Sequence, residues 1–184
     1  MASRTTSVRK STKSAARGRA AARIARAISA RRGAVNGRER RTKTEGAIRG
    51  GNGKYQFTLA EVKDVPAGTG YSTSHGGVVE GERMLVGYIH KERGTGSRMH
   101  THKNEQFNYV VRGTLVGSVN GKKVVAPAGT LIYIPANAPH TLVAAADDED
   151  VIFIAIKDLS QGIIGRAVDG TMTGPHYDPG FGPD

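Results

Sequence analysis

Short runs of alternating apolar and polar residues recur from about residue 55 to about residue 157. Alternation of this kind predicts β-strands that bury one face. The predicted strands cover residues 55–59, 78–91, 107–111, 114–119, 122–125, 130–134, 141–145 and 151–157. Turns rich in Gly, Pro and Asn separate them, and Asn120-Gly121 predicts a tight hairpin because both residues accept a positive φ. No helical pattern lies between the strands, so the sequence predicts an all-β sandwich or closed barrel.

The N-terminal part of the chain has a different composition from the rest. Residues 1–54 contain 16 Lys and Arg against 2 acidic residues, whereas residues 55–184 contain 11 against 14. The first part also has few large apolar side chains, so it cannot bury enough surface to offset the entropy of ordering. We therefore expect residues 1–53 to be a disordered basic tail, followed by a β-barrel at residues 54–160. The Gly- and Pro-rich residues 161–184 should wrap the surface as a C-terminal extension.

Three interpretations of the basic tail remain open. It is an extension without a specific function or a mis-assigned start, an organellar transit peptide, or an arm that binds nucleic acid or an anionic surface. An Arg-rich, Ser-rich and acid-poor composition is typical of transit peptides. Without a secretory signal, the expected location is the cytoplasm, and organellar import through residues 1–52 is the alternative.

Composition also restricts the chemistry. The chain has no cysteine, which excludes disulfides and thiolate-bound metal centres, so any metal must be held by nitrogen and oxygen ligands. No uninterrupted apolar stretch approaches the roughly 20 residues that a membrane-spanning helix requires. No phosphate-binding loop, dinucleotide fingerprint or Ser-His-Asp arrangement is recognisable in the sequence.

Three histidines form a candidate metal site. His100 and His102 have the same parity, so on a strand their side chains point to the same face. His140 follows a later strand and a proline-bounded loop, from which it can supply a third imidazole. Gln106 shares the parity of the first two histidines, whereas Glu105 has the opposite parity. Geometry therefore favours Gln106 as the fourth ligand through its amide oxygen, with Glu105 as the alternative.

The spacing of these residues resembles the two motifs of the cupins. The first motif is matched by Gly94, five residues, His100-Thr101-His102, three residues, Gln106, six residues and Gly113. The second is matched by Gly129, five residues, Pro135-Ala136-Asn137, two residues and His140. The family's inner Gly is Asn137 here, and its final Asn is Ala144. The resemblance covers about residues 80–157 and implies a double-stranded β-helix, or jelly-roll barrel, that is often dimeric.

Carried over to this chain, the family's metal ligands are His100, His102, Gln106 and His140. They imply one divalent transition metal (Fe, Mn, Ni, Zn or Cu) and a small anionic or oxygen-rich substrate. The resemblance places a dioxygenase slightly ahead of a decarboxylase, lyase or isomerase. The alternative is a non-catalytic binding module or regulator with a basic nucleic-acid-binding arm. Further candidates for pocket or acid–base roles are His90, His75, Tyr88, Asn108 and Tyr133.

Overall fold

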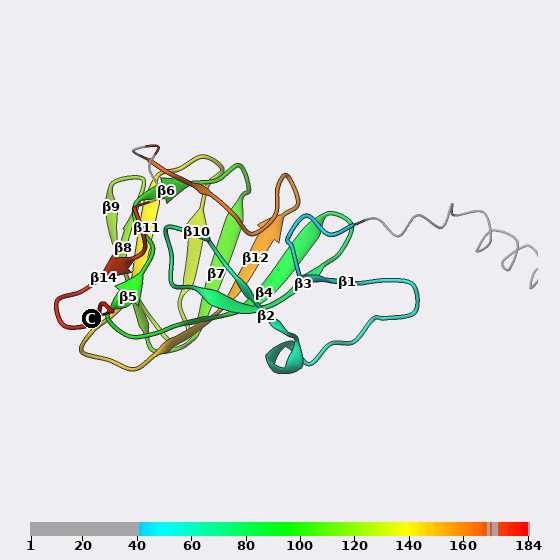
Figure 1. Cartoon of the computed structure of the whole chain (residues 1–184), viewed down its shortest axis with the longest axis horizontal. Coiled ribbons are helices and arrows are strands. Elements are labelled where there is room, and N and C mark those ends of the chain that lie inside the picture. The colour runs from blue at the N-terminus through cyan, green and yellow to red at the C-terminus, as the bar shows by residue number, and fades with distance from the viewer. Residues whose placement is uncertain (1–40, 169, 171–172, 184) are drawn as a thin grey trace, which may run out of the picture. The chain divides into compact units, whose positions relative to one another are not determined.

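The computed structural model describes residues 41–168, 170 and 173–183, and the tail expected to be disordered lies mostly outside these residues. The described part is almost entirely β-structure (Figure 1). Its strands are β1 (Ile48–Arg49), β2 (Asp64–Pro66), β3 (His75–Glu80), β4 (Met84–Lys91), β5 (Thr95–Gly96), β6 (His100–Thr101), β7 (Gln106–Arg112), β8 (Thr114–Val119), β9 (Lys122–Pro127), β10 (Leu131–Ile134), β11 (His140–Ala144), β12 (Val151–Asp158), β13 (Arg166–Ala167) and β14 (His176–Tyr177). The single short 3-10 helix of the described residues is η1 (Leu59–Glu61). None of their helices is long and apolar enough to span a membrane.

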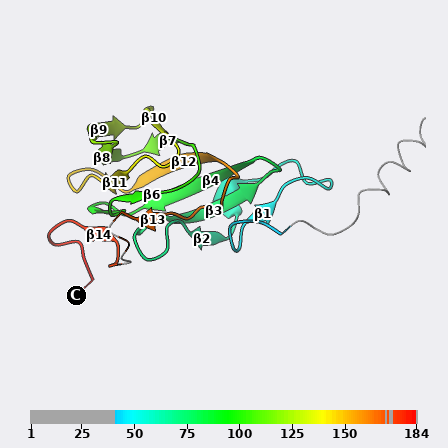
Figure 2. The ribbon, with the colours of Figure 1, turned by 90° about the horizontal axis from the view of Figure 1, so that it is seen from above.

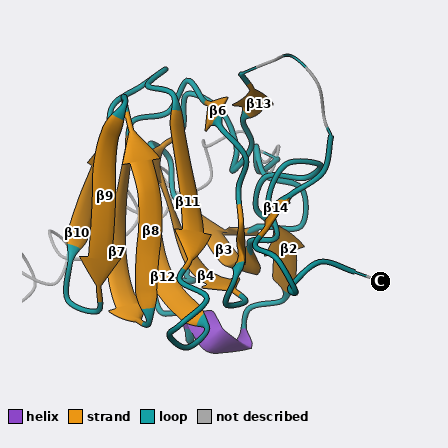
Figure 3. Ribbon diagram, turned by 90° about the vertical axis from the view of Figure 1, so that its left-hand side faces the viewer, coloured by secondary structure: helices purple, strands orange, loops and turns teal. Residues whose placement is uncertain are grey.

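The strands form two sheets. The first has the order β1-β3-β4-β12-β7-β10, with β2 paired to β3. The second contains β13-β6-β11-β5-β14, and β8 joins it by pairing with β11 and β9 (Figure 3). The inner faces enclose a core of aliphatic side chains and one phenylalanine, which includes Leu85, Ile89, Leu115, Ile134 and Phe153. This arrangement confirms the predicted all-β jelly-roll barrel.

The alternating pattern located most strands correctly, and two predictions were wrong. Residues 78–91 form the hairpin β3–β4 rather than one strand, and Gly81 N donates a hydrogen bond to Met84 O across its turn (2.8 Å). Residues 55–59 form no strand, although their pattern alternates. The edge of β3 that they might have occupied is taken by β1 and β2. At Asn120-Gly121 the positive φ angles of 50° and 76° confirm the predicted turn.

The folded body begins before the boundary expected at residue 53. Strand β1 pairs in parallel with β3, and Thr44 is buried. The carboxylate of Glu80, which is itself fully buried, accepts hydrogen bonds from the backbone N–H groups of Lys43 (2.8 Å) and Thr44 (2.7 Å). Residues 43–49 therefore belong to the barrel rather than to the tail.

The C-terminal residues also join the sheets. After β12 the chain passes to β13, which pairs with β6 (Figure 2). It then passes to β14, which pairs with β5. Thr44 Oγ1 accepts a hydrogen bond from Ile163 N (2.9 Å), and Ile163 belongs to the hydrophobic core. The expected extension at residues 161–184 is therefore partly built into the barrel.

Substitution of Glu80 tests the attachment of residues 43–44. Glu80→Ala leaves two backbone N–H groups without their charged acceptor, so the free energy of unfolding should fall by about 3 kcal/mol. Urea denaturation measures this loss. Glu82→Ala, at an exposed position in the neighbouring turn, is the control and should change stability by less than about 0.5 kcal/mol. Equal effects of the two substitutions would contradict the assigned role of Glu80.

Candidate metal centre

Three buried histidines converge inside the barrel. His100 lies on β6, His102 follows this strand directly, and His140 begins β11, where it is the cross-strand partner of His100. The ring centroids of His100 and His140 are 4.0 Å apart, and those of His102 and His140 are 4.7 Å apart. One nitrogen from each ring lies within 4.8 Å of the others. The expected clustering of the three imidazoles is therefore confirmed.

Backbone carbonyl groups fix the orientation of each ring. Nδ1 of His100 lies 2.8 Å from Arg98 O, and Nδ1 of His140 lies 2.9 Å from Ala138 O. Nδ1 of His102 lies 2.8 Å from Asn104 O. A carbonyl oxygen only accepts hydrogen bonds, so each Nδ1 carries the proton and each Nε2 presents a lone pair. The buried Nε2 of His102 has no hydrogen-bond partner among the described residues.

Burial keeps the three rings neutral. Desolvation is the main cause that lowers the pKa of His100 to about 2, that of His102 to about 3 and that of His140 to about 4. Mutual repulsion with neighbouring cationic groups lowers these pKa values further. Neutral imidazoles with inward lone pairs are what a transition metal requires, so these residues fit such an ion.

Gln106 and Glu105 point in opposite directions, as their parity predicts. Gln106 is buried and lines the same cavity as His100 and His140. Its Nε2 donates a hydrogen bond to Asn108 Oδ1 (2.6 Å), which leaves the amide oxygen of Gln106 available as a ligand. Glu105 is exposed, and its carboxylate accepts a hydrogen bond from the Tyr133 hydroxyl group (2.8 Å).

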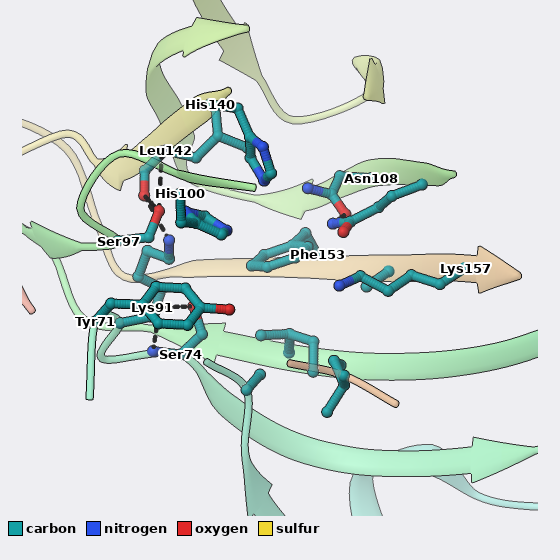
Figure 4. Close-up of a pocket in the computed structure, with 16 residues that line it drawn as sticks. Tyr71, Ser74, Lys91, Ser97, His100, Asn108, His140, Leu142, Phe153 and Lys157 are labelled. Carbon is teal, nitrogen blue, oxygen red and sulfur yellow. Dashed lines mark hydrogen bonds between the residues drawn. The ribbon is translucent and has the colours of Figure 1, made fainter. Parts of the chain in front are cut away.

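A small cavity adjoins the histidines. It has about 50 Å³ of room for the centres of water-sized groups, which corresponds to about four such groups. In Figure 4 the side chain of Lys157 and the hydroxyl group of Tyr71 point towards its middle from opposite sides. Burial raises the pKa of Tyr71 and lowers the pKa of both Lys91 and Lys157 to about 7. Asn108 also lines this cavity, as the sequence predicted.

Four of the predicted pocket residues lie elsewhere. On β4, Ile89 and Lys91 face the cavity, so Tyr88 and His90 face the other side of the sheet. His75 lies on β3 opposite His90, with the two rings stacked at 5.7 Å, and its Nδ1 contacts Asp64 Oδ2 at 2.7 Å. Tyr133 is about half exposed on β10. None of these four candidates lines this cavity.

The sequence analysis did not identify Lys91, Lys157 and Tyr71 as cavity residues. A signal was present for the two lysines, because each occupies an inward position of a strand whose other inward residues are apolar, such as Ile89 and Phe153. Lysine is rare at an inward-facing strand position, since burial of an ammonium group is costly. Tyr71 lies in a loop without regular periodicity, and no local pattern indicated its position.

Comparison with known proteins agrees with this geometry. Residues 87–157 match the family model of the cupin domain, so this part of the chain is a cupin domain. Both residues that match the ends of the first cupin motif, Gly94 and Gly113, have positive φ angles, and so does Asn137, which stands where the family has glycine. Asparagine tolerates this region better than most residues, which explains the departure.

Several solved structures are similar to this chain. The polyketide cyclase RemF from Streptomyces resistomycificus is 17% identical, with a TM-score of 0.51 over 58% of this chain and 80% of that chain. An RmlC-like cupin from Shewanella frigidimarina is 20% identical, with a TM-score of 0.46 over 56% of this chain and 88% of the other. KdgF from Halomonas sp. is 22% identical, with a TM-score of 0.45 over 53% and 86% of the two chains. None of the curated proteins matches this chain.

The lowered pKa values predict how the stability of the metal-free protein depends on pH. The unfolded histidines take up protons below about pH 6.5, whereas the folded ones do so only near pH 4 for His140, 3 for His102 and 2 for His100. The unfolded state thus binds more protons to these three groups between these limits, so their contribution to stability is full above pH 6.5 and is lost as pH falls. The three groups together contribute a slope of up to about 4 kcal/mol per pH unit between pH 6 and 4.

Urea denaturation at a series of pH values, with a chelator present, isolates the contribution of one ring. His140→Ala should reduce that slope by about 1.4 kcal/mol per pH unit between pH 6 and 5, because one titrating group is removed. His90→Ala, on the opposite face of β4, should leave the contribution of the three rings intact. A slope that does not change in His140→Ala would show that the ring of His140 is not held neutral by the fold.

Proposed function

We propose that this protein is a mononuclear metal-dependent cupin enzyme that acts on a small anionic or oxygen-rich molecule. His100, His102, His140 and the amide oxygen of Gln106 would hold one divalent transition metal. The observation that carries the proposal is the set of three buried rings whose Nδ1 protons are bound by carbonyl groups. Each ring offers one nitrogen within 4.8 Å of the other two, and the buried Nε2 of His102 has no other hydrogen-bond partner among the described residues.

The ligand set restricts the metal and its chemistry. Imidazole nitrogen and amide oxygen suit Fe, Mn, Ni, Zn or Cu. All four ligands are neutral, so a bound ion would retain its positive charge and act as a Lewis acid towards a substrate oxygen. Asn108 supports this role, because its Oδ1 accepts the hydrogen bond of Gln106 Nε2 and so turns the Gln106 oxygen away from Asn108.

Cavity side chains would orient the substrate and move protons. The raised pKa of Tyr71 keeps its hydroxyl group protonated at neutral pH, so this group can donate a hydrogen bond or a proton to a substrate oxygen. Its ring packs against His100 with centroids 4.4 Å apart, which places the hydroxyl group beside the centre. Apolar walls formed by Ile89, Phe153 and Ile163 limit the access of water.

Among reaction classes, a dioxygenase is our first candidate, because use of O2 is the commonest role of such a site in the cupins. A decarboxylase, lyase or isomerase requires the same ligands and is the next candidate. The small cavity favours a substrate of few carbon atoms in each case. We expect the protein to work in the cytoplasm unless residues 1–52 direct it to an organelle.

A second candidate function is a non-catalytic cupin regulator with a nucleic-acid-binding arm. The observation in its favour is the concentration of 16 Lys and Arg in residues 1–54. Basic arms of this kind bind phosphate backbones in a salt-dependent manner. Salt-sensitive retention on DNA that disappears when residues 1–52 are deleted would favour this function over a purely enzymatic one.

The outer face of the first sheet supports the proposal of a homodimer. Tyr109, Leu131 and Tyr133 are each about half exposed, and strand register places Phe107 and Tyr109 directly beside the two residues of β10. On the other side of β7, Ile154 of β12 pairs with Tyr109 and Ile156 pairs with Phe107, so apolar side chains continue across three strands. A contiguous apolar surface of this kind is unusual on a monomer.

Metal analysis and an oxygen-electrode assay test the proposed function. Purified protein should contain about one transition-metal ion per chain, and His140→Ala should lower metal affinity by on the order of a hundredfold. Glu105→Ala, next to Gln106 but directed outwards, is the matched control and should keep its metal. Oxygen uptake with small keto or enol acids would support a dioxygenase. Negligible metal, or metal content that is indifferent to His140→Ala, would refute the proposed centre.

Sedimentation velocity tests the dimer. The wild-type protein should sediment as a dimer at micromolar concentration, and Tyr109→Glu should shift it to the monomer because a charge would be buried in the contact. Val125→Glu places the same charge on an exposed apolar position of β9 in the other sheet, and should leave the dimer intact. A wild-type monomer, or dissociation by both substitutions alike, would contradict the proposed contact surface.

A further inference from the structure

The cavity beside the histidines has an unusual charge balance. Two lysines, Lys91 and Lys157, line it together with the histidine centre, and none of the described residues that line it is Asp or Glu. Both lysines are buried, with 3% and 5% of their surfaces exposed. Buried cationic groups are normally paired with a carboxylate, since burial of an unpaired charge is costly. Two such groups in one cavity therefore require an explanation.

The two lysines differ in how their amines are satisfied. Nζ of Lys91 donates a hydrogen bond to Leu142 O (2.6 Å), an oxygen that also accepts a hydrogen bond from the Ser97 hydroxyl group (3.2 Å). The ion pairs of the described residues involve His75, Arg112 and His176, and so include neither lysine. Lys157 makes no side-chain hydrogen bond within the part of the chain that the structure describes, and its amine points into the cavity (Figure 4). Lys157 is thus the group that lacks a partner.

Apart from the proposed metal ligands, the other polar groups that line the cavity around Lys157 can donate hydrogen bonds. Oδ1 of Asn108 accepts the hydrogen bond of Gln106, so the Asn108 side chain has its NH₂ group left to offer. Ser72 Oγ donates to Ser74 Oγ, which leaves the proton of the Ser74 hydroxyl group free. The Tyr71 hydroxyl group also reaches this space. A ligand that satisfies this cavity must accept several hydrogen bonds and carry negative charge.

We infer that the cavity binds the carboxylate of a small acid, with Lys157 as its charged partner and a second substrate oxygen directed to the histidine centre. The ammonium group of Lys157 would form a charge-assisted hydrogen bond with one carboxylate oxygen. Lys91 stays on Leu142 O and adds positive potential at the other end of the cavity. The space of about four water-sized groups suits a hydroxy or keto acid of two to four carbon atoms. This inference deepens the proposed function and rests on it only for the position of the second oxygen.

Calorimetric titration of Lys157→Met tests the inference. The probes are glycolate, oxalate, pyruvate and malonate, and butane-2,3-dione is the uncharged analogue that matches pyruvate in size. The full chain is titrated both metal-loaded and after chelation. At least one acid should bind the wild-type protein, and Lys157→Met should weaken that binding by about thirtyfold or more. Butane-2,3-dione should show the same affinity for the wild-type protein and for Lys157→Met.

Two further variants separate recognition from a structural role. Lys123→Met, at an exposed position on β9, should bind the acid as the wild type does. Lys157→Arg keeps the charge and should retain binding to within about tenfold. Because Lys157 is unpaired, its replacement by an apolar residue of similar length should leave the melting temperature unchanged or raise it. A lysine with a purely structural role would instead lower the melting temperature when replaced.

The outcomes also separate this inference from the proposed metal centre. Metal content equal to that of the wild type in Lys157→Met, with acid binding lost, supports the inference. If the wild-type protein takes up no metal, the metal centre is refuted, but acid binding that depends on Lys157 still supports the inference. The inference is overturned if no acid binds, if Lys157→Met binds as the wild type does, or if the uncharged dione binds as tightly as pyruvate.

Discussion

The hydrogen bonds between three imidazole Nδ1 atoms and three backbone carbonyl groups are the constraint on which the centre depends. Each carbonyl lies two residues from its histidine, at Arg98, Asn104 and Ala138. Local backbone geometry therefore sets the tautomer and the ring orientation together. Burial then disfavours the protonated, cationic form of each ring, because its charge would have to be desolvated. The result is three neutral rings, each with an unprotonated Nε2, gathered inside the barrel within 4.8 Å of one another.

The rest of the fold holds those carbonyl groups in place. Asn104, whose carbonyl accepts the His102 proton, is fully buried, and its side chain donates to Asp158 O (2.6 Å) and Gln161 O (2.8 Å). Asn137 N donates to His102 O (2.8 Å), which ties the loop before His140 to the first histidine pair. The residues that follow β12 thus belong to the support of the centre.

The residues that flank the central sheets close the barrel over the cavity. A side chain at Gly165 would meet Tyr71 Oη at 2.7 Å and His100 Cδ2 at 3.0 Å, so the chain passes too close to the centre for any larger residue. At Gly162 a side chain would meet the backbone of Lys43 at 2.6 Å. The segments 43–44 and 162–165 therefore pack together, and both were assigned to extensions from their composition. Composition reports average polarity, and it does not show which few residues pair with a distant strand.

Much of the site was predictable because strand parity is a local property. Alternation alone placed Gln106 inward and Glu105 outward, and both positions are confirmed. The same rule could not say which face of β4 is the inner one. From the sequence, His90 and its neighbour Lys91 were therefore equally plausible as cavity residues. That choice depends on pairing with β12, across more than sixty residues of sequence, and on which face packs against the second sheet. Tyr71 reaches the cavity from a loop, and a loop has no periodic pattern from which its path could be predicted.

The account is tested most directly by long-range ¹H–¹⁵N NMR of the histidine rings, with and without Zn²⁺ as a diamagnetic metal. His100, His102 and His140 should each be neutral with the proton on Nδ1 in the metal-free protein. Addition of one equivalent of Zn²⁺ should shift the Nε2 resonance of all three rings and leave their Nδ1 protons in place. Coordination through any Nδ1, or a ring among the three whose Nε2 does not respond to Zn²⁺, would contradict the account.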